Sequence, residues 1–207
     1  MRYKKEIRKQ FVRTMKKASS DVDLSMIRAK YLDWQWLFKR FYPVVLRLKE
    51  WGCNFVIDFG CGTGGLVTLA NLMKVRMVGI DVPVIARGEN QYNVVTSELN
   101  KMGFPIKVFD TSKYPWDFES DSVDAVTAFQ SIREDYIAST ERNHLSWDNE
   151  IICRRIKEIS RIVKPKGIWH IGSKGHYAGL KRSAVWHSLS EKQPKIMLWS
   201  GSGLKNS

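Results

Sequence analysis

Several features of membrane and secreted proteins are missing from this 207-residue sequence. No apolar run approaches the ~20 residues that a membrane-spanning helix needs, and there is no apolar h-region of a secretory signal. The three cysteines, Cys53, Cys61 and Cys153, are odd in number and lack C-x-x-C spacing. They therefore predict reduced, mostly buried thiols in a cytoplasmic protein, and no metal site is expected.

Acidic residues are scarce at both ends of the chain. There are 34 Lys and Arg residues against 21 Asp and Glu residues, which gives a net charge of +13. Residues 1–50 carry +9 and residues 164–207 carry +7, whereas residues 51–163 carry −3. Two interpretations stay open: the basic flanks contact a polyanion, or the charge serves solubility alone.

Residues 1–50 are expected to form a basic, aromatic-rich, helical N-terminal extension. Within residues 1–17 the apolar side chains fall on roughly one helical face, which predicts an amphipathic helix that is solvated, grips a polyanion or lies on a membrane surface. A second helix is expected to begin near Asp21 and to break or kink at Pro43.

A glycine-rich turn at residues 60–65 follows a short apolar stretch that contains Asp58, and it precedes a short apolar helix. In such a turn a ligand can touch bare backbone, and the helix N-terminus favours carboxylate or phosphate oxygens. Gly60, Gly62 and Gly65 fit the G-x-G-x-x-G fingerprint of dinucleotide sites, with an acid at about the right spacing downstream.

A second pattern competes for the same turn. Asp58 with Gly60, Gly62 and Gly64 fits D-x-G-x-G-x-G. A carboxylate at this position suits a ligand that bears an ammonium and a sulfonium better than a pyrophosphate. A purely structural glycine turn is the third interpretation.

Beyond the turn, short strands alternate with helices. The expected strands are 53–59, 76–81, 106–110, 124–129 and 168–172, and the expected helices are 65–74, 88–102 and 148–163. This order predicts an α/β fold: a Rossmann-like, doubly wound, mostly parallel sheet with helices on both faces, preceded by N-terminal helices. Asp58, Asp81 and Asp110 fall at the carboxyl ends of strands, where ligands bind in such sheets. We expect this domain to span residues 51–200 and residues 201–207 to form a flexible tail.

Five stretches of residues 53–172 resemble class I S-adenosylmethionine (AdoMet) methyltransferases of the type 11 group: 56–65, 78–81, 109–111, 114–126 and 159–167. The resemblance implies that AdoMet is the cofactor. It places Asp58 and the turn residues Gly60, Cys61, Gly62 and Gly64 near the methionine part. It implies that Asp81 binds the ribose hydroxyls and that Asp110 accepts a hydrogen bond from adenine beside the Thr111 amide. Three residues become candidates to contact adenine or cover the methyl donor: Ile80, Val82 and Phe129.

The same resemblance implies methyl transfer to an acceptor beyond strands four and five, either a small molecule or RNA. Weak candidates for a general base are Glu134, Asp135, His144 and His176, so the catalytic residue stays unassigned. The sequence lacks Asn-Pro-Pro-Tyr and Pro-Cys, which disfavours exocyclic amine methylation by the usual route and cytosine C5 methylation. A non-catalytic AdoMet-binding partner subunit or regulator is the alternative, and an NAD-binding oxidoreductase is a further one.

The C-terminus departs from the family pattern of a helix followed by two antiparallel strands. About 35 residues follow the fifth strand, and we expect one further strand at residues 195–200. The last edge strand is expected to be missing or very short, which would leave the acceptor pocket open.

Overall fold

The computed structural model describes residues 2–21, 33–81, 91–109, 113–128, 131, 134–135, 143–144, 149–170, 180–182, 186, 190–191, 193–200 and 203–206. Five residues of the predicted site lie outside the described residues: Val82, Asp110, Thr111, Phe129 and His176.

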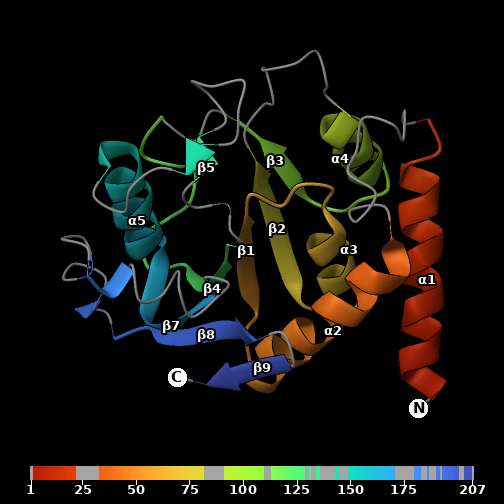
Figure 1. Ribbon diagram of the computed structural model, residues 1–207, viewed down its shortest axis with the longest axis horizontal. Helices are drawn as coiled ribbons and strands as arrows, with labels where there is room; N and C mark the ends of the chain where they lie inside the picture. The colour runs from red at the N-terminus through yellow and green to blue at the C-terminus, as the bar shows by residue number, and fades with distance from the viewer. Residues whose placement is uncertain are drawn as a thin grey trace.

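A seven-stranded sheet forms the centre of the molecule, with strands in the order β3–β2–β1–β4–β7–β8–β9 (Figure 1). Its strands are β1 (Phe55–Phe59), β2 (Arg76–Asp81), β3 (Ile106–Val108), β4 (Val123–Thr127), β7 (Val163–His170), β8 (Lys195–Ser200) and β9 (Gly203–Asn206). The first six strands in this order are parallel, and β9 is antiparallel to β8. The predicted Rossmann-like, mostly parallel α/β fold is therefore confirmed.

Helices cover both faces of the sheet and enclose two cores. One core joins the sheet to α1 (Arg2–Ala18), α2 (Trp34–Glu50), α3 (Gly65–Leu72) and α4 (Gln91–Lys101). The other lies on the opposite face under α5 (Glu150–Ile162). Figure 1 shows α1 standing at one side of the molecule, with α5 at the other. Within the described residues, no helix has the length and apolar character that a bilayer span requires.

The second helix begins later than the sequence predicted. Asp33 caps α2 by accepting a hydrogen bond from the Trp36 amide at 2.9 Å, and its ψ of 82° is not helical. An N-cap near Asp21 is therefore wrong for this helix. Of the predicted break or kink at Pro43, the break is wrong, because α2 continues through Pro43 to Glu50.

The C-terminal end contains more regular structure than we expected. Gly203–Asn206, part of the predicted flexible tail, forms β9 and pairs with β8 from Met197 to Ser200. The expected edge strand is thus present and short. Only two residues separate the paired ends Ser200 and Gly203, which is the commonest length for a hairpin connection.

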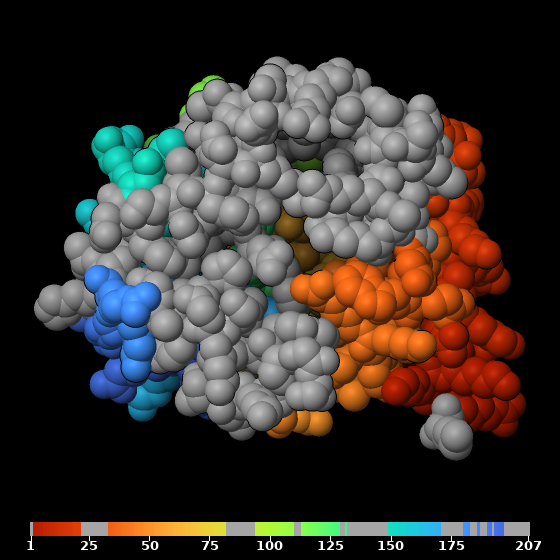
Figure 2. Space-filling view, viewed as in Figure 1, coloured from red at the N-terminus to blue at the C-terminus, as the bar shows by residue number. Residues whose placement is uncertain are grey.

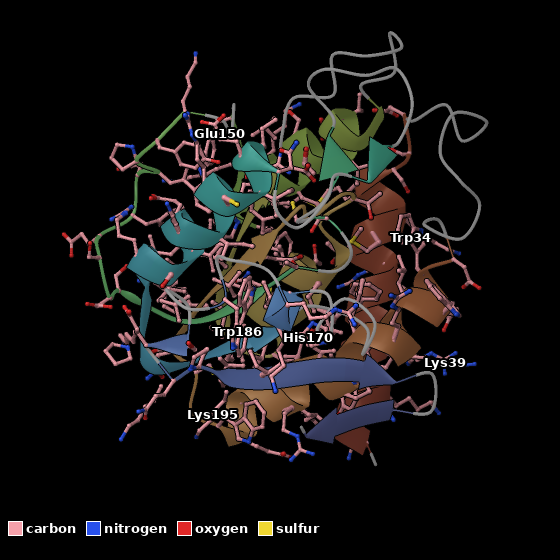
Figure 3. All side chains as sticks on the ribbon, turned by 60° about the vertical axis from the view of Figure 1, so that its left-hand side comes forward. Trp34, Lys39, Glu150, His170, Trp186 and Lys195 are labelled. Carbon is pink, nitrogen blue, oxygen red and sulfur yellow. The ribbon has the colours of Figure 1, made fainter. Side chains whose placement is uncertain are left out.

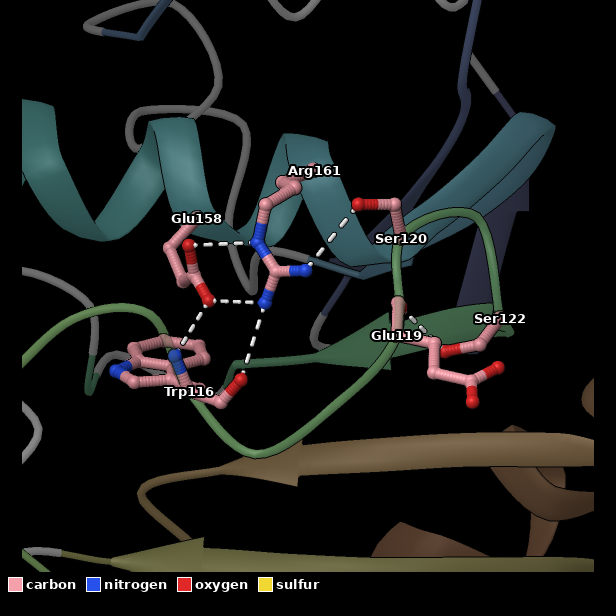
Figure 4. A network of polar contacts seen from close by, with 6 residues as sticks. All are labelled: Trp116, Glu119, Ser120, Ser122, Glu158 and Arg161. Atoms are coloured by element: carbon pink, nitrogen blue, oxygen red, sulfur yellow. Dashed lines mark hydrogen bonds and ion pairs between the residues drawn. The ribbon is translucent and has the colours of Figure 1, made fainter.

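A polar network holds the segment before β4 to α5 (Figure 4). The Trp116 amide donates to Glu158 Oε1 at 2.7 Å, and Arg161 Nη2 donates to the Trp116 carbonyl at 3.1 Å. Arg161 Nε also donates to Glu158 Oε2 at 3.0 Å. The buried Trp116 ring stacks on Phe59 with centroids 5.4 Å apart. This network therefore supports the carboxyl end of β1 from the α5 side.

Candidate functional site

The turn between β1 and α3 is fastened to the neighbouring strand β2. The Gly60 and Cys61 amides both donate to the Ile80 carbonyl, at 2.8 and 3.2 Å, and the Gly64 amide donates to the Cys61 carbonyl at 2.9 Å. Ile80 itself is completely buried in the core under α5. Its side chain therefore packs the protein, which corrects the expectation that it contacts adenine.

Asp81 at the end of β2 contacts the same turn directly. Its Oδ2 accepts a hydrogen bond from the Gly62 amide at 2.6 Å. A carboxylate has several acceptor positions, so this bond does not exhaust its capacity. Asp81 is half-buried and stands beside the turn, where a vicinal diol can meet a carboxylate.

Two glycines of the turn adopt positive φ, but their surroundings differ. Gly60 has φ of 69°, and a Cβ built on it would lie 2.1 Å from Ser131 Cβ. Gly62 has φ of 55°, and a Cβ there would meet nothing within 4 Å. Backbone at Gly62 therefore borders open space, whereas Gly60 is closed in by Ser131.

Asp58 is the buried acid of the site, with only 4% of its surface exposed. Its Oδ1 accepts a hydrogen bond from the Thr127 hydroxyl at 2.6 Å. Burial raises the pKa of Asp58 to about 7; the hydrogen bond from Thr127 acts in the opposite direction, and the charge of Asp81 raises the pKa further. A carboxylate in this position is stabilised by a cation, because the protein supplies too little solvation for its charge.

Asp58 belongs to a buried polar row that crosses neighbouring strands. The register pairs it with Gly79 on β2 and with Thr127 on β4, and Thr127 is paired with His170 on β7. Each of these four residues lies two positions after a residue of the core under α1–α4 on the same strand. Because side chains alternate between the faces of a strand, all four positions face that side of the sheet. The row therefore runs beneath the helices that cover the glycine turn.

His170 closes this row at β7 and is completely buried (Figure 3). Burial lowers the pKa of His170 to about 3, and the positive charge of Arg40 on α2 lowers it further. The imidazole is therefore neutral in the folded protein at ordinary pH. Sequence reasoning missed His170 and Thr127, because a polar residue in an apolar strand is visible but its alignment with Asp58 depends on strand register.

Cys61 packs against the neighbouring strand. A Cβ on Gly79 would lie 2.8 Å from Cys61 Sγ, so the glycine leaves room for the thiol. Burial, followed by the charges of Asp81 and Asp58, raises the pKa of Cys61 well above its usual range. The thiol is therefore neutral, and all three cysteines of the chain are free.

Three of the candidate general bases lie on two short paired strands. Glu134 and Asp135 form β5, and Asn143–His144 forms β6. The two strands are antiparallel, and the register sets Glu134 opposite His144. The structure therefore brings the backbones of these two candidates together, although seven residues, 136–142, separate β5 from β6 along the chain.

Comparison with known proteins gives similar folds only. No protein family model matches the chain, and no curated protein matches it. SAM-bound CalS10, an amino pentose methyltransferase from Micromonospora echinaspora, is 12% identical with a TM-score of 0.43; the alignment covers 80% of this chain and 52% of that one. The [4+2]-cyclase SpnF is 22% identical with a TM-score of 0.48, over 77% of this chain and 57% of that one.

A SAM-dependent methyltransferase from Archaeoglobus fulgidus is 17% identical with a TM-score of 0.40, over 61% of this chain and 50% of that one. The chain thus spans about half the length of the solved chains that it matches. At these identities and TM-scores, its function has to be inferred from its own residues.

Proposed function

We propose that the chain is an AdoMet-dependent methyltransferase, with a small molecule or RNA as the methyl acceptor. The observation that carries the proposal is Asp58: a buried carboxylate at the end of β1, beside a glycine turn, with its pKa raised to about 7. Such a group favours a ligand that brings positive charge to the turn. AdoMet carries both an ammonium and a sulfonium.

The surroundings of Asp58 match the rest of a zwitterionic amino-acid end. The first-turn amides of α3 have no partner within the helix, and Gly64 at the N-cap has no side chain to cap them. A helix N-terminus favours a carboxylate. The ammonium of the ligand would therefore meet the Asp58 carboxylate, and its carboxylate would meet the N-terminus of α3.

A dinucleotide fits this site less well. Its pyrophosphate would have to bind at the same glycine turn, where the charge of Asp81 already contributes to the raised pKa of Asp58. Two carboxylates beside two phosphates would repel them. The charges of the site therefore favour AdoMet over NAD.

AdoMet supplies an activated methyl group on a sulfonium. The chain's part in the reaction is to bind and orient, since proximity and alignment can contribute on the order of 7–11 kcal/mol to such a displacement. Asp58 and the turn would hold the methionine end, and Asp81 the ribose. If the acceptor atom carries a proton, a base must take it, and the paired strands β5 and β6 hold three candidates: Glu134, Asp135 and His144.

Binding and transfer are tested separately. Isothermal titration should show AdoMet binding and no binding of NAD, and Asp81→Ala should weaken AdoMet binding by about 1–3 kcal/mol because charge-assisted hydrogen bonds are lost. Asp117→Ala, which removes a carboxylate that is 98% exposed, is the matched control and should bind normally. Binding of NAD instead of AdoMet would contradict the proposal.

Methyl transfer is followed with methyl-labelled AdoMet and two fractions of cell extract, one of RNA and one of small molecules. Label in either fraction supports the enzyme. Tight AdoMet binding without transfer to any fraction would favour a non-catalytic AdoMet-binding partner subunit or regulator. Chain variants with altered Asp81 should lose transfer in proportion to the AdoMet affinity they lose.

A further inference from the structure

Helix α1 presents a continuous basic ridge to solvent. Its 17 residues include eight cations and one acid. At 100° per residue, five of the cations fall within a sector about 80° wide: Arg2, Lys5, Lys9, Arg13 and Lys16. All five are exposed, and none of them forms an ion pair within the part of the chain that the structure describes.

The ridge has the dimensions of a nucleic-acid contact. Its cations succeed one another every three or four residues, about 4.5–6 Å along the axis, and span about 21 Å in total. Along one strand of a duplex a phosphate follows every ~3.4 Å of the axis, so the cation spacing allows a contact with every phosphate or every second phosphate. Figure 2 shows α1, in red, along one side of the molecule.

A groove of about 460 Å³ runs beside the ridge. Tyr3, Glu6 and Gln10 of α1 form one wall, and Lys74 and Phe104 belong to the facing wall. Tyr3 is 55% exposed. An aromatic ring beside a line of cations is the combination on which single-stranded bases stack while their phosphates are held.

A membrane surface fits α1 less well. A helix that lies in a membrane interface inserts its apolar face. In α1 this face is already occupied, because Ile7, Phe11 and Met15 are buried in the core shared with α2, α3 and α4. The exposed side of α1, with its cations and Tyr3, is the side that can contact a partner.

We propose that this surface binds single-stranded RNA, with phosphates on the ridge and a base stacked on Tyr3 in the groove. Glu6, the one acid of α1, lines the groove beside the ridge. Its carboxylate repels phosphate and accepts a hydrogen bond from a 2′-hydroxyl, which RNA has and DNA lacks. This inference names RNA as the acceptor class of the proposed methyl transfer and in that respect rests on it.

The path of α1 agrees with such a role. In Figure 1 the helix runs beside the sheet in the direction of β1 and β2, so its last turn lies toward the end of the sheet that carries the glycine turn. An RNA strand held along the ridge is thereby led from the groove toward the carboxyl ends of the strands.

The test is fluorescence anisotropy with a labelled 20-nucleotide single-stranded RNA of mixed sequence, without AdoMet, between 50 and 200 mM salt. Five phosphate contacts predict a slope of about −3.5 for log K against log salt. Lys5→Gln with Lys9→Gln should reduce the slope to about −2 and the affinity at 100 mM salt by more than about tenfold. Lys157→Gln with Lys166→Gln, two exposed lysines elsewhere, is the matched control and should bind like the wild type.

Four results would overturn the inference. Equal losses in both double variants would show that binding follows net charge alone. Equal affinity for DNA of the same sequence, or binding to phosphatidylserine vesicles and not to RNA, would remove the assignment to RNA. Tyr3→Ala should lose at least about fivefold in RNA affinity and Tyr3→Phe almost none. Equal RNA affinities of these two variants would contradict the stacking of a base on Tyr3. Because the binding assay contains no AdoMet, its results do not depend on whether the proposed enzyme function is correct.

Discussion

At the scale of single residues, alanine substitutions at Gly60 and Gly62 distinguish the cost of backbone strain from the cost of a steric clash. Both have positive φ, which costs a side-chain-bearing residue about 1–2 kcal/mol. Only Gly60 faces Ser131 at a distance that no Cβ tolerates. Gly62→Ala should therefore lower the free energy of unfolding by about 1 kcal/mol and Gly60→Ala by about 3 kcal/mol or more.

Denaturant unfolding measures both changes. Combining Gly60→Ala with Ser131→Gly should recover the steric part of the loss and leave the backbone part, together with the cost of the lost hydrogen bond from Ser131 to the Phe59 carbonyl. Equal losses in the two single variants would show that Ser131 yields without cost, and the closed side of the turn would then be misassigned.

A second prediction at the residue scale concerns the protonation of Asp58. Without ligand its pKa is about 7, so at lower pH the carboxyl must lose a proton before it can meet a cation. AdoMet affinity should therefore fall roughly tenfold from pH 7 to pH 5.5. The comparison stops at pH 7 because an α-amino group titrates near 8.

Calorimetry in two buffers of different ionisation enthalpy should detect release of a proton on binding below pH 7. Asp58→Asn should bind more weakly, with an affinity that no longer changes between pH 5.5 and 7. A pH-independent affinity of the wild type would mean that Asp58 does not face the positive charge of the ligand.

At the scale of elements, most of the sheet could be predicted from the sequence. β2 and β8 have the predicted bounds, because each is a short apolar run between clear boundaries, Lys74 and Pro194 among them. Helix α2 was less predictable: Asp21 and Asp33 can both serve as caps in the sequence, and the structure has the cap at Asp33, directly before the buried Trp34. Asp58 and Asp81 follow from the glycine pattern.

Across-strand partners could not be predicted in the same way. Thr127 and His170 reach Asp58 only through the register of β1, β4 and β7, which a single sequence does not specify. Ser131 closes the turn from beyond β4 by donating to the Phe59 carbonyl at 2.5 Å, and nothing local in the sequence marks that contact.

The buried row also predicts opposite pH responses at its two ends. The folded pKa of His170 is about 3, so its contribution to stability is complete above pH 6.5 and is lost as the pH falls from 6.5 toward 3, because the unfolded chain takes up the proton first. When the pH is lowered from 7.5 to 5, the free energy of unfolding of His170→Gln should therefore fall by about 2 kcal/mol less than that of the wild type.

Denaturant unfolding at both pH values measures this difference. Asp58→Asn is the informative control, because the raised pKa of Asp58 gives a contribution that is complete below pH 3.8 and is lost as the pH rises to about 7. Asp58→Asn should therefore change the pH dependence of the free energy of unfolding in the opposite direction to His170→Gln. An acid response unchanged by His170→Gln would show that another group governs it.

At the scale of the whole molecule, charge and packing are divided between the two faces of α1. The outward face carries the cations, whereas the inward face joins the core of the sheet. The acids Asp58 and Asp81 lie at the carboxyl ends of the strands. A polyanion is therefore attracted to the helix and repelled from the turn, and a cationic ligand has the opposite preference.

This division requires α1 to be a fixed part of the fold. Phe11 is completely buried, and its ring centroid lies 5.9 Å from that of Phe38 on α2. Phe11→Ala should therefore lower the free energy of unfolding by about 3–5 kcal/mol. Tyr3→Ala, on the exposed side of the same helix, should cost less than about 1 kcal/mol while weakening RNA binding. Far-UV circular dichroism and tryptophan fluorescence should report one coincident transition in both variants. Loss of helix before the fluorescence change would instead mean that α1 detaches alone, and the ridge would then be a mobile arm with no fixed spacing of its cations.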